Sequence, residues 1–161
     1  LLLGRIGTTL HNKLDGYVAG NLLDVRLPVT TTIQHKPPVP ENWNHVLHDV
    51  DSIARATHMR GRICKLILEC GLLTDDEIRR ASAIAKEAGV HYLKTGTGFH
   101  GYPATVEMVR VLKELAGSEM KIKAAGGIRT REMAEALLQA GADRIGTSAG
   151  PALIGKVIAG S

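Results

Sequence analysis

Two lysines end two apolar stretches of this chain, and each is followed at once by glycine-rich sequence. Lys94 lies in "HYLKTGTGFH" (residues 91–100) and Lys123 in "KIKAAGGIRT" (residues 121–130). On neighbouring strands, two ammonium groups about 6 Å apart would repel by roughly 3 kcal/mol at an effective dielectric constant of about 20, equivalent to a lysine pKa lower by roughly two. Burial lowers the pKa of a lysine in the same direction. A neutral amine adds to carbonyl groups to give a carbinolamine and then a Schiff base, so the pair indicates imine chemistry. The alternative is that each amine merely extends to solvent.

Glycine turns after the predicted strands indicate an anion site close to these amines. Gly126 and Gly127 lie past a strand end and before a helix that Thr130 can cap, and "GTSAG" (residues 146–150) forms a similar turn. Backbone N–H groups at such glycines can approach a phosphate without interference from a Cβ atom, and the helix dipole favours the anion. The alternative is that these segments are only tight turns.

The elements that must position these groups alternate regularly along the chain. The predicted strands are residues 62–69, 90–95, 121–127 and 142–150, and the predicted helices between and after them are 72–89, 102–117, 130–141 and a terminal helix. Upstream, residues 21–29 read as a strand and 41–59 as an amphipathic helix, joined by a proline-rich loop. Strands that alternate with helices indicate a parallel sheet with crossover helices, so we expect one α/β domain over residues 1–161.

Polar residues at the predicted strand ends favour a closed barrel over an open nucleotide-binding sheet. Asp24, Glu69, Lys94 and Lys123 all lie at the carboxyl ends of strands, where barrel enzymes carry their chemistry. Pro103 and a loop separate the glycines after Lys94 from the next helix, which is unlike a dinucleotide-binding turn. We expect Glu69 to orient a lysine ammonium group.

Composition and residue spacing argue against several other classes of protein. The charge of +4 comes from scattered basic residues and only 3% of residues are aromatic, so nucleic-acid binding is disfavoured. No run approaches the roughly 18 apolar residues of a membrane helix, and Cys64 and Cys70 read as buried thiols, so we expect a cytoplasmic protein. His45 and His48 have no third ligand at a defined spacing, so we expect no metal.

Four segments, in this order and spacing, resemble deoxyribose-phosphate aldolase: "CKLILECGLLTDDEI", "YLKTGTGFH", "IKAAGGIRT" and "RIGTSAG". The resemblance spans roughly residues 22–153 and implies a (β/α)8 barrel and a class I aldolase without metal or cofactor. Such an enzyme cleaves 2-deoxy-D-ribose 5-phosphate to acetaldehyde and D-glyceraldehyde 3-phosphate. Its partners would be these small molecules and copies of itself, with neither nucleic acid nor membrane.

The resemblance also implies a role for individual residues. Lys94 matches the Schiff-base lysine, Lys123 matches the second lysine that depresses its pKa, and Asp24 in "LLDVRLP" matches the proton-relay aspartate. The phosphate would contact Thr97, Gly98, Gly126, Gly127 and Ser148.

The chain departs from the family pattern in two ways. Gly96 and Ala125 stand where the family commonly has serine, which removes two hydroxyl groups close to the lysines. The length of 161 residues is below the roughly 200 that such barrels need, so we expect the first two βα units to be missing from this chain. A Schiff-base aldolase for another phosphorylated sugar or keto acid, or a non-catalytic sugar-phosphate-binding remnant of a barrel, are the alternatives.

Overall fold

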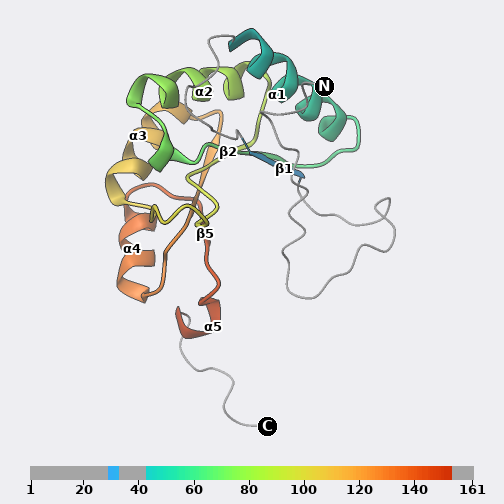
Figure 1. Cartoon of the computed structure of the whole chain (residues 1–161). Helices are drawn as coiled ribbons and strands as arrows, with labels where there is room; N and C mark the ends of the chain where they lie inside the picture. Colours follow the sequence, from blue (N-terminus) through green and yellow to red (C-terminus); the bar gives the residue numbers. More distant parts are fainter. Residues whose placement is uncertain (1–28, 33–42, 154–161) are drawn as a thin grey trace.

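A five-stranded parallel sheet forms the centre of the molecule (Figure 1). The computed structural model describes residues 29–32 and 43–153. The strands are β1 (Val29–Thr32), β2 (Cys64–Ile67), β3 (Tyr92–Lys94), β4 (Lys121–Ala125) and β5 (Arg144–Gly146). Each strand pairs in parallel with the next one in the sequence, so the spatial order is β1-β2-β3-β4-β5. This order is that of consecutive strands in a barrel, whereas a doubly wound sheet would reverse direction at a switch point.

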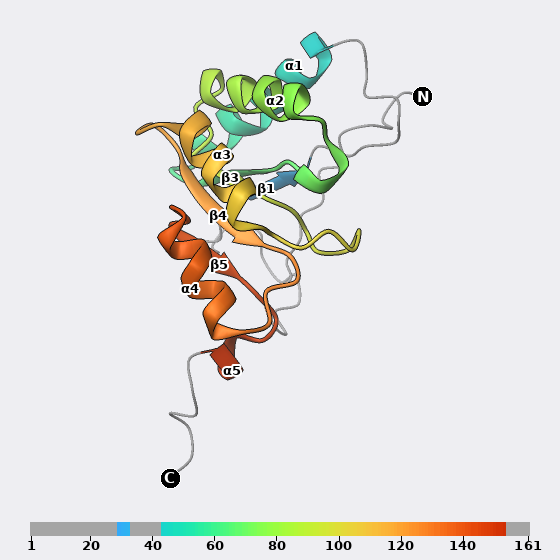
Figure 2. The same ribbon diagram turned by 90° about the vertical axis from the view of Figure 1, so that its left-hand side faces the viewer.

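Helices connect the strands and cover one face of the sheet. They are α1 (Trp43–His58), α2 (Asp75–Glu87), α3 (Val106–Ala116), α4 (Arg131–Gln139) and the short α5 (Gly150–Leu153), and a 3₁₀ turn, η1 (Cys70–Leu72), follows β2. In Figures 1 and 2, α1 to α4 form an arc on the outside of the sheet, and none of them lies on its other face. The predicted barrel architecture is confirmed, and the described strands form a continuous part of its wall.

Local sequence determines where the helices begin. The hydroxyl of Thr74 accepts a hydrogen bond from the N–H of Glu77, and the Glu77 carboxylate accepts one from the N–H of Thr74, which together form a capping box at the start of α2. Thr130 caps α4 by accepting a hydrogen bond from the N–H of Met133. The predicted cap at Thr130 is confirmed.

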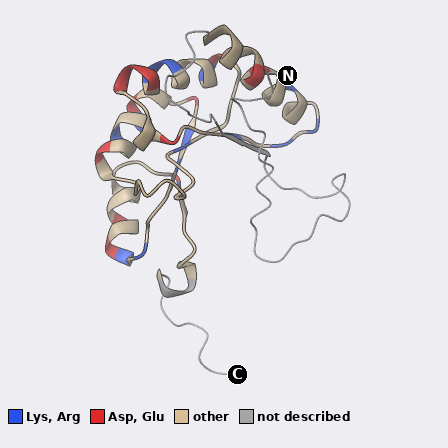
Figure 3. Cartoon of the chain, viewed as in Figure 1, with Lys and Arg blue, Asp and Glu red and all other residues tan. Residues whose placement is uncertain are grey.

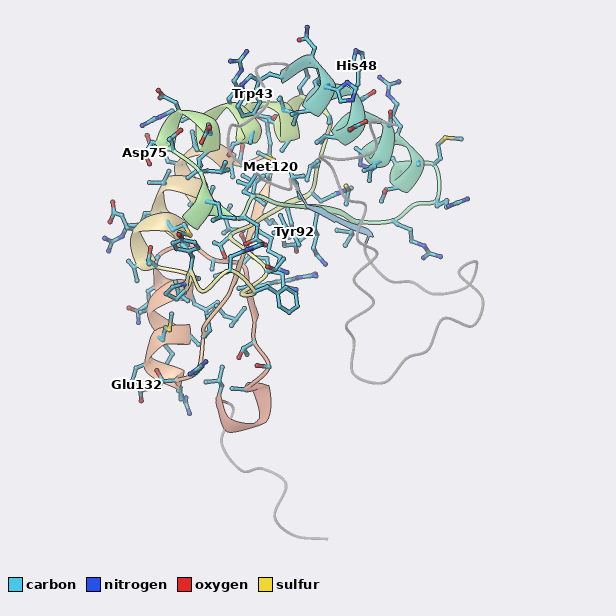
Figure 4. The ribbon with its side chains drawn as sticks, viewed as in Figure 1. Trp43, His48, Asp75, Tyr92, Met120 and Glu132 are labelled. Carbon is cyan, nitrogen blue, oxygen red and sulfur yellow. The ribbon has the colours of Figure 1, made fainter. Side chains whose placement is uncertain are left out.

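The two faces of the sheet carry different side chains. Leu66, Leu93 and Ile122 are fully buried and belong to the apolar core between sheet and helices. Side chains alternate along a strand, so their neighbours Lys65, Ile67, Tyr92, Lys94 and Lys123 lie on the opposite face. We call this the inner face. In Figure 4, Tyr92 lies on the concave side of the sheet, whereas His48, Asp75 and Glu132 lie on the helices outside it.

Most predicted elements are found with shorter bounds, and part of the prediction lies outside the described residues. The strand predicted at residues 21–29 overlaps the described region only at Val29, where β1 begins. Asp24 and the proline-rich loop before α1 are not among the described residues. In the described part of the chain, no helix combines the length and apolar character needed to cross a membrane.

Candidate active site

Lys94 and Lys123 are register partners on adjacent strands. Lys94 is the last residue of β3, as predicted, and lies beside Lys123. Lys123 was predicted to end its strand as well, but it lies in the middle of β4, because the two alanines after it continue the strand. Partners on neighbouring strands point to the same face and their backbones are about 4.8 Å apart, so both amines emerge together on the inner face. Both side chains are partly buried. The proximity that the sequence predicted for the two lysines is therefore present in the structure.

The pKa of Lys94 is lowered to about 8, which leaves an appreciable fraction of the amine neutral near physiological pH. Burial is the largest cause, the Lys123 ammonium group adds to it, and the Glu69 carboxylate acts in the opposite direction. Burial also lowers the pKa of Lys123, with a further contribution from Arg144. Desolvation thus outweighs the charge repulsion that the sequence analysis placed first.

A third lysine, Lys65, belongs to the same cationic cluster. It lies on β2 at the register position of Tyr92, is 4% exposed, and places its Nζ 5.5 Å from the centre of the Tyr92 ring. Arg144 of β5 places its Cζ 4.7 Å from the centre of the same ring. Burial, followed by Lys123, Arg144 and Lys94, lowers the pKa of Lys65 to about 8. The aromatic face of Tyr92 partly compensates two cations that have no carboxylate within ion-pair distance among the described residues.

The sequence analysis did not identify Lys65, Tyr92 or Arg144 as part of the site. The alternation of side chains along a strand could have placed them on the inner face, because Lys65 precedes Ile67 and Tyr92 precedes Lys94 by two positions. It could not have shown that they are neighbours, because the register between strands cannot be read from the sequence.

A glycine on β5 makes room for the second lysine. A Cβ atom at Gly146 would lie 2.8 Å from Cε of Lys123 and 3.5 Å from its Nζ. Any other residue at position 146 would therefore move the ammonium group away from its present place beside Lys94.

Glu69, two residues after the last residue of β2, has a backbone conformation that is unusual for its residue type. Its φ of 54° and ψ of 53° place it in the left-handed region, and it is the one non-glycine residue with positive φ in the described part of the chain. Its side chain is 6% exposed, and Oε1 accepts a hydrogen bond of 2.7 Å from the N–H of Thr97. The carboxylate was expected to orient a lysine ammonium group, whereas its recorded hydrogen bond is to the loop that follows Lys94.

Glycines bring the loops after β3 and β4 into direct contact. A Cβ atom at Gly98, whose φ is +86°, would lie 3.2 Å from Cα of Gly126. A Cβ atom at Gly127, whose φ is +65°, would lie 2.9 Å from Cβ of Pro103. These residues need to be glycine because the two loops approach so closely, a structural reason that holds whether or not an anion binds there.

Two threonines connect the same group of loops. The Thr95 hydroxyl donates to the carbonyl of Ala125 at 2.7 Å and accepts from its N–H at 2.9 Å. The Thr147 hydroxyl donates to the carbonyl of Ile128 at 2.6 Å, which holds the loop containing the exposed Ser148 against the loop that precedes α4. The five predicted phosphate contacts, Thr97, Gly98, Gly126, Gly127 and Ser148, therefore lie on three connected loops at the carboxyl ends of β3, β4 and β5.

Among the described residues, the histidines on α1 and the two cysteines provide neither a metal site nor a reactive thiol. Within residues 29–32 and 43–153, no group of three His, Cys, Asp or Glu side chains could hold a metal ion, and His45 and His48 are on α1. Cys64 and Cys70 are free and buried, and burial raises the pKa of both thiols, that of Cys70 to about 12, so neither is a reactive thiolate.

His91 has a structural role at the opposite end of the sheet. Its Nδ1 accepts a hydrogen bond from the N–H of Cys64 at 3.0 Å, just before β3 begins.

Several curated proteins similar to this chain in sequence are deoxyribose-phosphate aldolases. No protein-family model matches the chain. Deoxyribose-phosphate aldolase from Desulfitobacterium hafniense is 48% identical over 113 residues, which cover 70% of this chain and 52% of that enzyme. The enzyme of the same name from Thermococcus gammatolerans is 44% identical over 113 residues, 70% of this chain and 50% of its own length.

Solved structures agree with the sequence relatives. An aldolase named QR15 has a TM-score of 0.63 and 42% identity, covering 67% of this chain and 48% of its own. Deoxyribose phosphate aldolase from Aeropyrum pernix has a TM-score of 0.63 and 34% identity, covering 66% of this chain and 46% of its own. The chain spans about half the length of the curated relatives it matches. Over that half, it is a homologue of the deoxyribose-phosphate aldolases, as the sequence motifs predicted.

Proposed function

We propose that this chain is the part of a class I aldolase that contains its two active-site lysines, Lys94 and Lys123. The enzyme cleaves 2-deoxy-D-ribose 5-phosphate to acetaldehyde and D-glyceraldehyde 3-phosphate. The observation that carries the proposal is the register pairing of Lys94 with Lys123, combined with a pKa of about 8 for Lys94. The names of the relatives give the substrate.

Lys94 supplies the nucleophile. Its neutral amine adds to the C1 aldehyde of the open-chain sugar, and loss of water gives a protonated imine. The C3 hydroxyl then loses its proton, the C2–C3 bond breaks, and its electron pair moves toward the imine nitrogen to form an enamine. Glyceraldehyde 3-phosphate leaves, C2 of the enamine takes up a proton, and hydrolysis releases acetaldehyde and the free amine.

Lys123 and Asp24 have different roles in these steps: Lys123 acts on the pKa of Lys94, and Asp24 transfers protons. A positive charge on Lys123 lowers the pKa of Lys94, which favours the neutral nucleophile. Asp24 is assigned the proton relay by sequence position alone, since it lies outside the described residues. A carboxylate suits that role because it can accept and return the protons that move at C2 and C3.

The substrate phosphate would bind at the three connected loops. Backbone N–H groups near Gly98, Gly126 and Gly127 and the hydroxyl groups of Thr97 and Ser148 are donors of the kind that phosphate needs. The reaction as written uses no metal or cofactor.

We also propose that the protein acts in the cytoplasm as an assembly of several copies. The related aldolase from Aeropyrum pernix is described as having a tetrameric structure, which supports the assembly.

Borohydride trapping tests the proposal. Incubating the chain with acetaldehyde and borohydride should add an ethyl group to Lys94, observed by peptide mass spectrometry. Modification of Lys123 alone would reverse the two lysine roles. Loss of activity with a chelator and its return with zinc would overturn the mechanism. Tight phosphate binding with no trapped adduct would favour the non-catalytic alternative.

A further inference from the structure

A buried carboxylate lies next to the cationic inner face, and the reaction proposed above gives it no role. Glu69 is the only acid among the described residues with a recorded electrostatic effect on Lys94. The charged groups that act on Lys94 are Lys123 of β4 and Glu69, which follows β2. Lys65 of β2 interacts with Lys94 in turn, and Arg144 of β5 acts on Lys65 and Lys123. Tyr92 is the neighbouring titratable group on β3 itself.

The backbone conformation of Glu69 shows that the carboxylate is held in place. A glutamate with a φ of 54° costs free energy, and residues in this region persist only when their surroundings hold them there. The surroundings are well defined in this case. The N–H of Cys70 donates to the carbonyl of Thr95 at 2.8 Å, the N–H of Leu68 donates to the carbonyl of Lys94 at 3.0 Å, and Thr97 donates to the carboxylate itself.

Gly96 provides the space that the carboxylate occupies. A Cβ atom at residue 96 would lie 3.0 Å from Oε2 of Glu69, closer than side chains normally approach. Because Gly96 has no Cβ atom, the Glu69 carboxylate lies against the loop directly after Lys94 without this close contact.

We propose that Glu69 is a positioning residue of the lysine site, with two separable functions: its hydrogen bond fixes the loop that follows Lys94, and its charge opposes that of Lys123. This role for Glu69 rests on the proposed aldolase function. The effects of Glu69 on the pKa of Lys94 and on the loop can nevertheless be measured without aldolase activity.

Two conservative variants separate the two functions in the whole chain. Glu69→Gln keeps an oxygen that can accept the Thr97 N–H but removes the charge. Glu69→Asp keeps the charge but is one methylene shorter, so it cannot reach Thr97 from the same backbone position. Glu114→Gln, at an exposed position of α3, is the matched control for removal of a carboxylate.

The charge is read from the pH dependence of Lys94 acetylation by trace acetic anhydride, followed by mass spectrometry. The midpoint should be near pH 8 in the unaltered chain and in Glu114→Gln. It should fall by about one pH unit in Glu69→Gln and stay near that of the unaltered chain in Glu69→Asp. A midpoint that is unchanged or higher in Glu69→Gln would overturn the electrostatic role.

The hydrogen bond is read from deuterium exchange of residues 95–98. Exchange should be roughly tenfold faster in Glu69→Asp and unchanged in Glu69→Gln. Equal protection in both variants, or equal loss in both, would overturn the role in the loop. Because neither measurement uses substrate, failure of borohydride trapping would count against the proposed function alone.

Discussion

The outer and inner faces of the sheet come from the same strands but have opposite chemistry. On the outer face, Leu66, Leu93 and Ile122 are fully buried against the helices. On the inner face, the next residues along the same strands are Lys65, Lys94 and Lys123, joined by Arg144. Figure 3 shows basic and acidic residues mixed along the outer helices, so the predominance of cations is a property of the inner face.

The comparison shows how one element can provide both stability and reactivity. Apolar burial on the outer face stabilises the sheet by about 25 cal/mol for each Å² removed from water. That stability supports an inner face on which partly buried cations lie close together at a cost in free energy. The pKa values of Lys65, Lys94 and Lys123 are lowered because burial makes the charged form of each amine less favourable. Four predictions test the division of roles.

The largest effect should come from removing the nucleophile. Lys94→Leu should abolish borohydride-trapped acetaldehyde at that position at every pH, because no amine remains to form the imine. The readout is adduct mass across pH 6 to about 10. Lys86→Leu, on the exposed side of α2, is the control and should leave trapping unchanged. Full trapping on another lysine in Lys94→Leu would contradict the assignment.

On the outer face, the large effect should be on folding rather than on chemistry. Leu93→Ala removes a side chain that is 0% exposed and should lower the free energy of unfolding by about 2–5 kcal/mol. Urea denaturation measures this, and Leu138→Ala on the exposed surface of α4 should cost about 0.5 kcal/mol or less. The midpoint of Lys94 acetylation should remain near pH 8 in folded Leu93→Ala. A shift there would show that the two faces are not separable.

The third prediction is a smaller, pH-dependent loss. Lys123→Leu removes a charge that lowers the pKa of Lys94, so this pKa should rise from about 8. Imine trapping at pH 7 should then be roughly tenfold slower and should approach that of the unaltered chain as the pH rises to about 10. Lys121→Leu, at the exposed start of the same strand, should leave the pH profile unchanged. A uniform loss at all pH values would mean that Lys123 acts through packing or contact with substrate.

The smallest effect should be on the pH dependence of stability. The pKa of Lys65 is about 8 in the folded chain, below the ordinary value of about 10.4, so between these values the unfolded state binds more protons. Stability should therefore rise with pH in this window, with the full cost of burying the charge present below pH 8. Lys65→Met should reduce the rise in melting temperature between pH 8 and about 10, leaving the part due to Lys94 and Lys123. An identical rise in Lys65→Met, compared with Lys121→Met as control, would show that Lys65 is not a source of it.

Local sequence was sufficient for the elements and for part of the site. The capping box of Thr74 and Glu77, the cap at Thr130 and the apolar spacing of α2 all act within one or two turns, so their signals are contiguous in the chain. Lys94 and Lys123 were found because a lysine within an apolar stretch is visible without knowledge of the fold, although only Lys94 ends its strand. The order of the strands followed from their alternation with helices.

Tertiary structure alone decided which charges share a surface and how each one is held. The hydrogen bond from Thr97 to Glu69 and the pair between Thr95 and Ala125 join residues 28 and 30 positions apart. From the sequence, Gly98, Gly126 and Gly146 were expected to lie in glycine-rich loops and turns. The structure shows that each also packs so closely against a neighbouring residue that a Cβ atom would be crowded by it. Lys65 meets Tyr92 through the register of β2 and β3, whereas Arg144 of β5, the register partner of Lys123 on β4, lies over the same ring from two strands away. Burial depends on all the elements packed around a side chain. Periodicity in one strand fixes which face a residue occupies, but it contains no information about the residue beside it on the next strand.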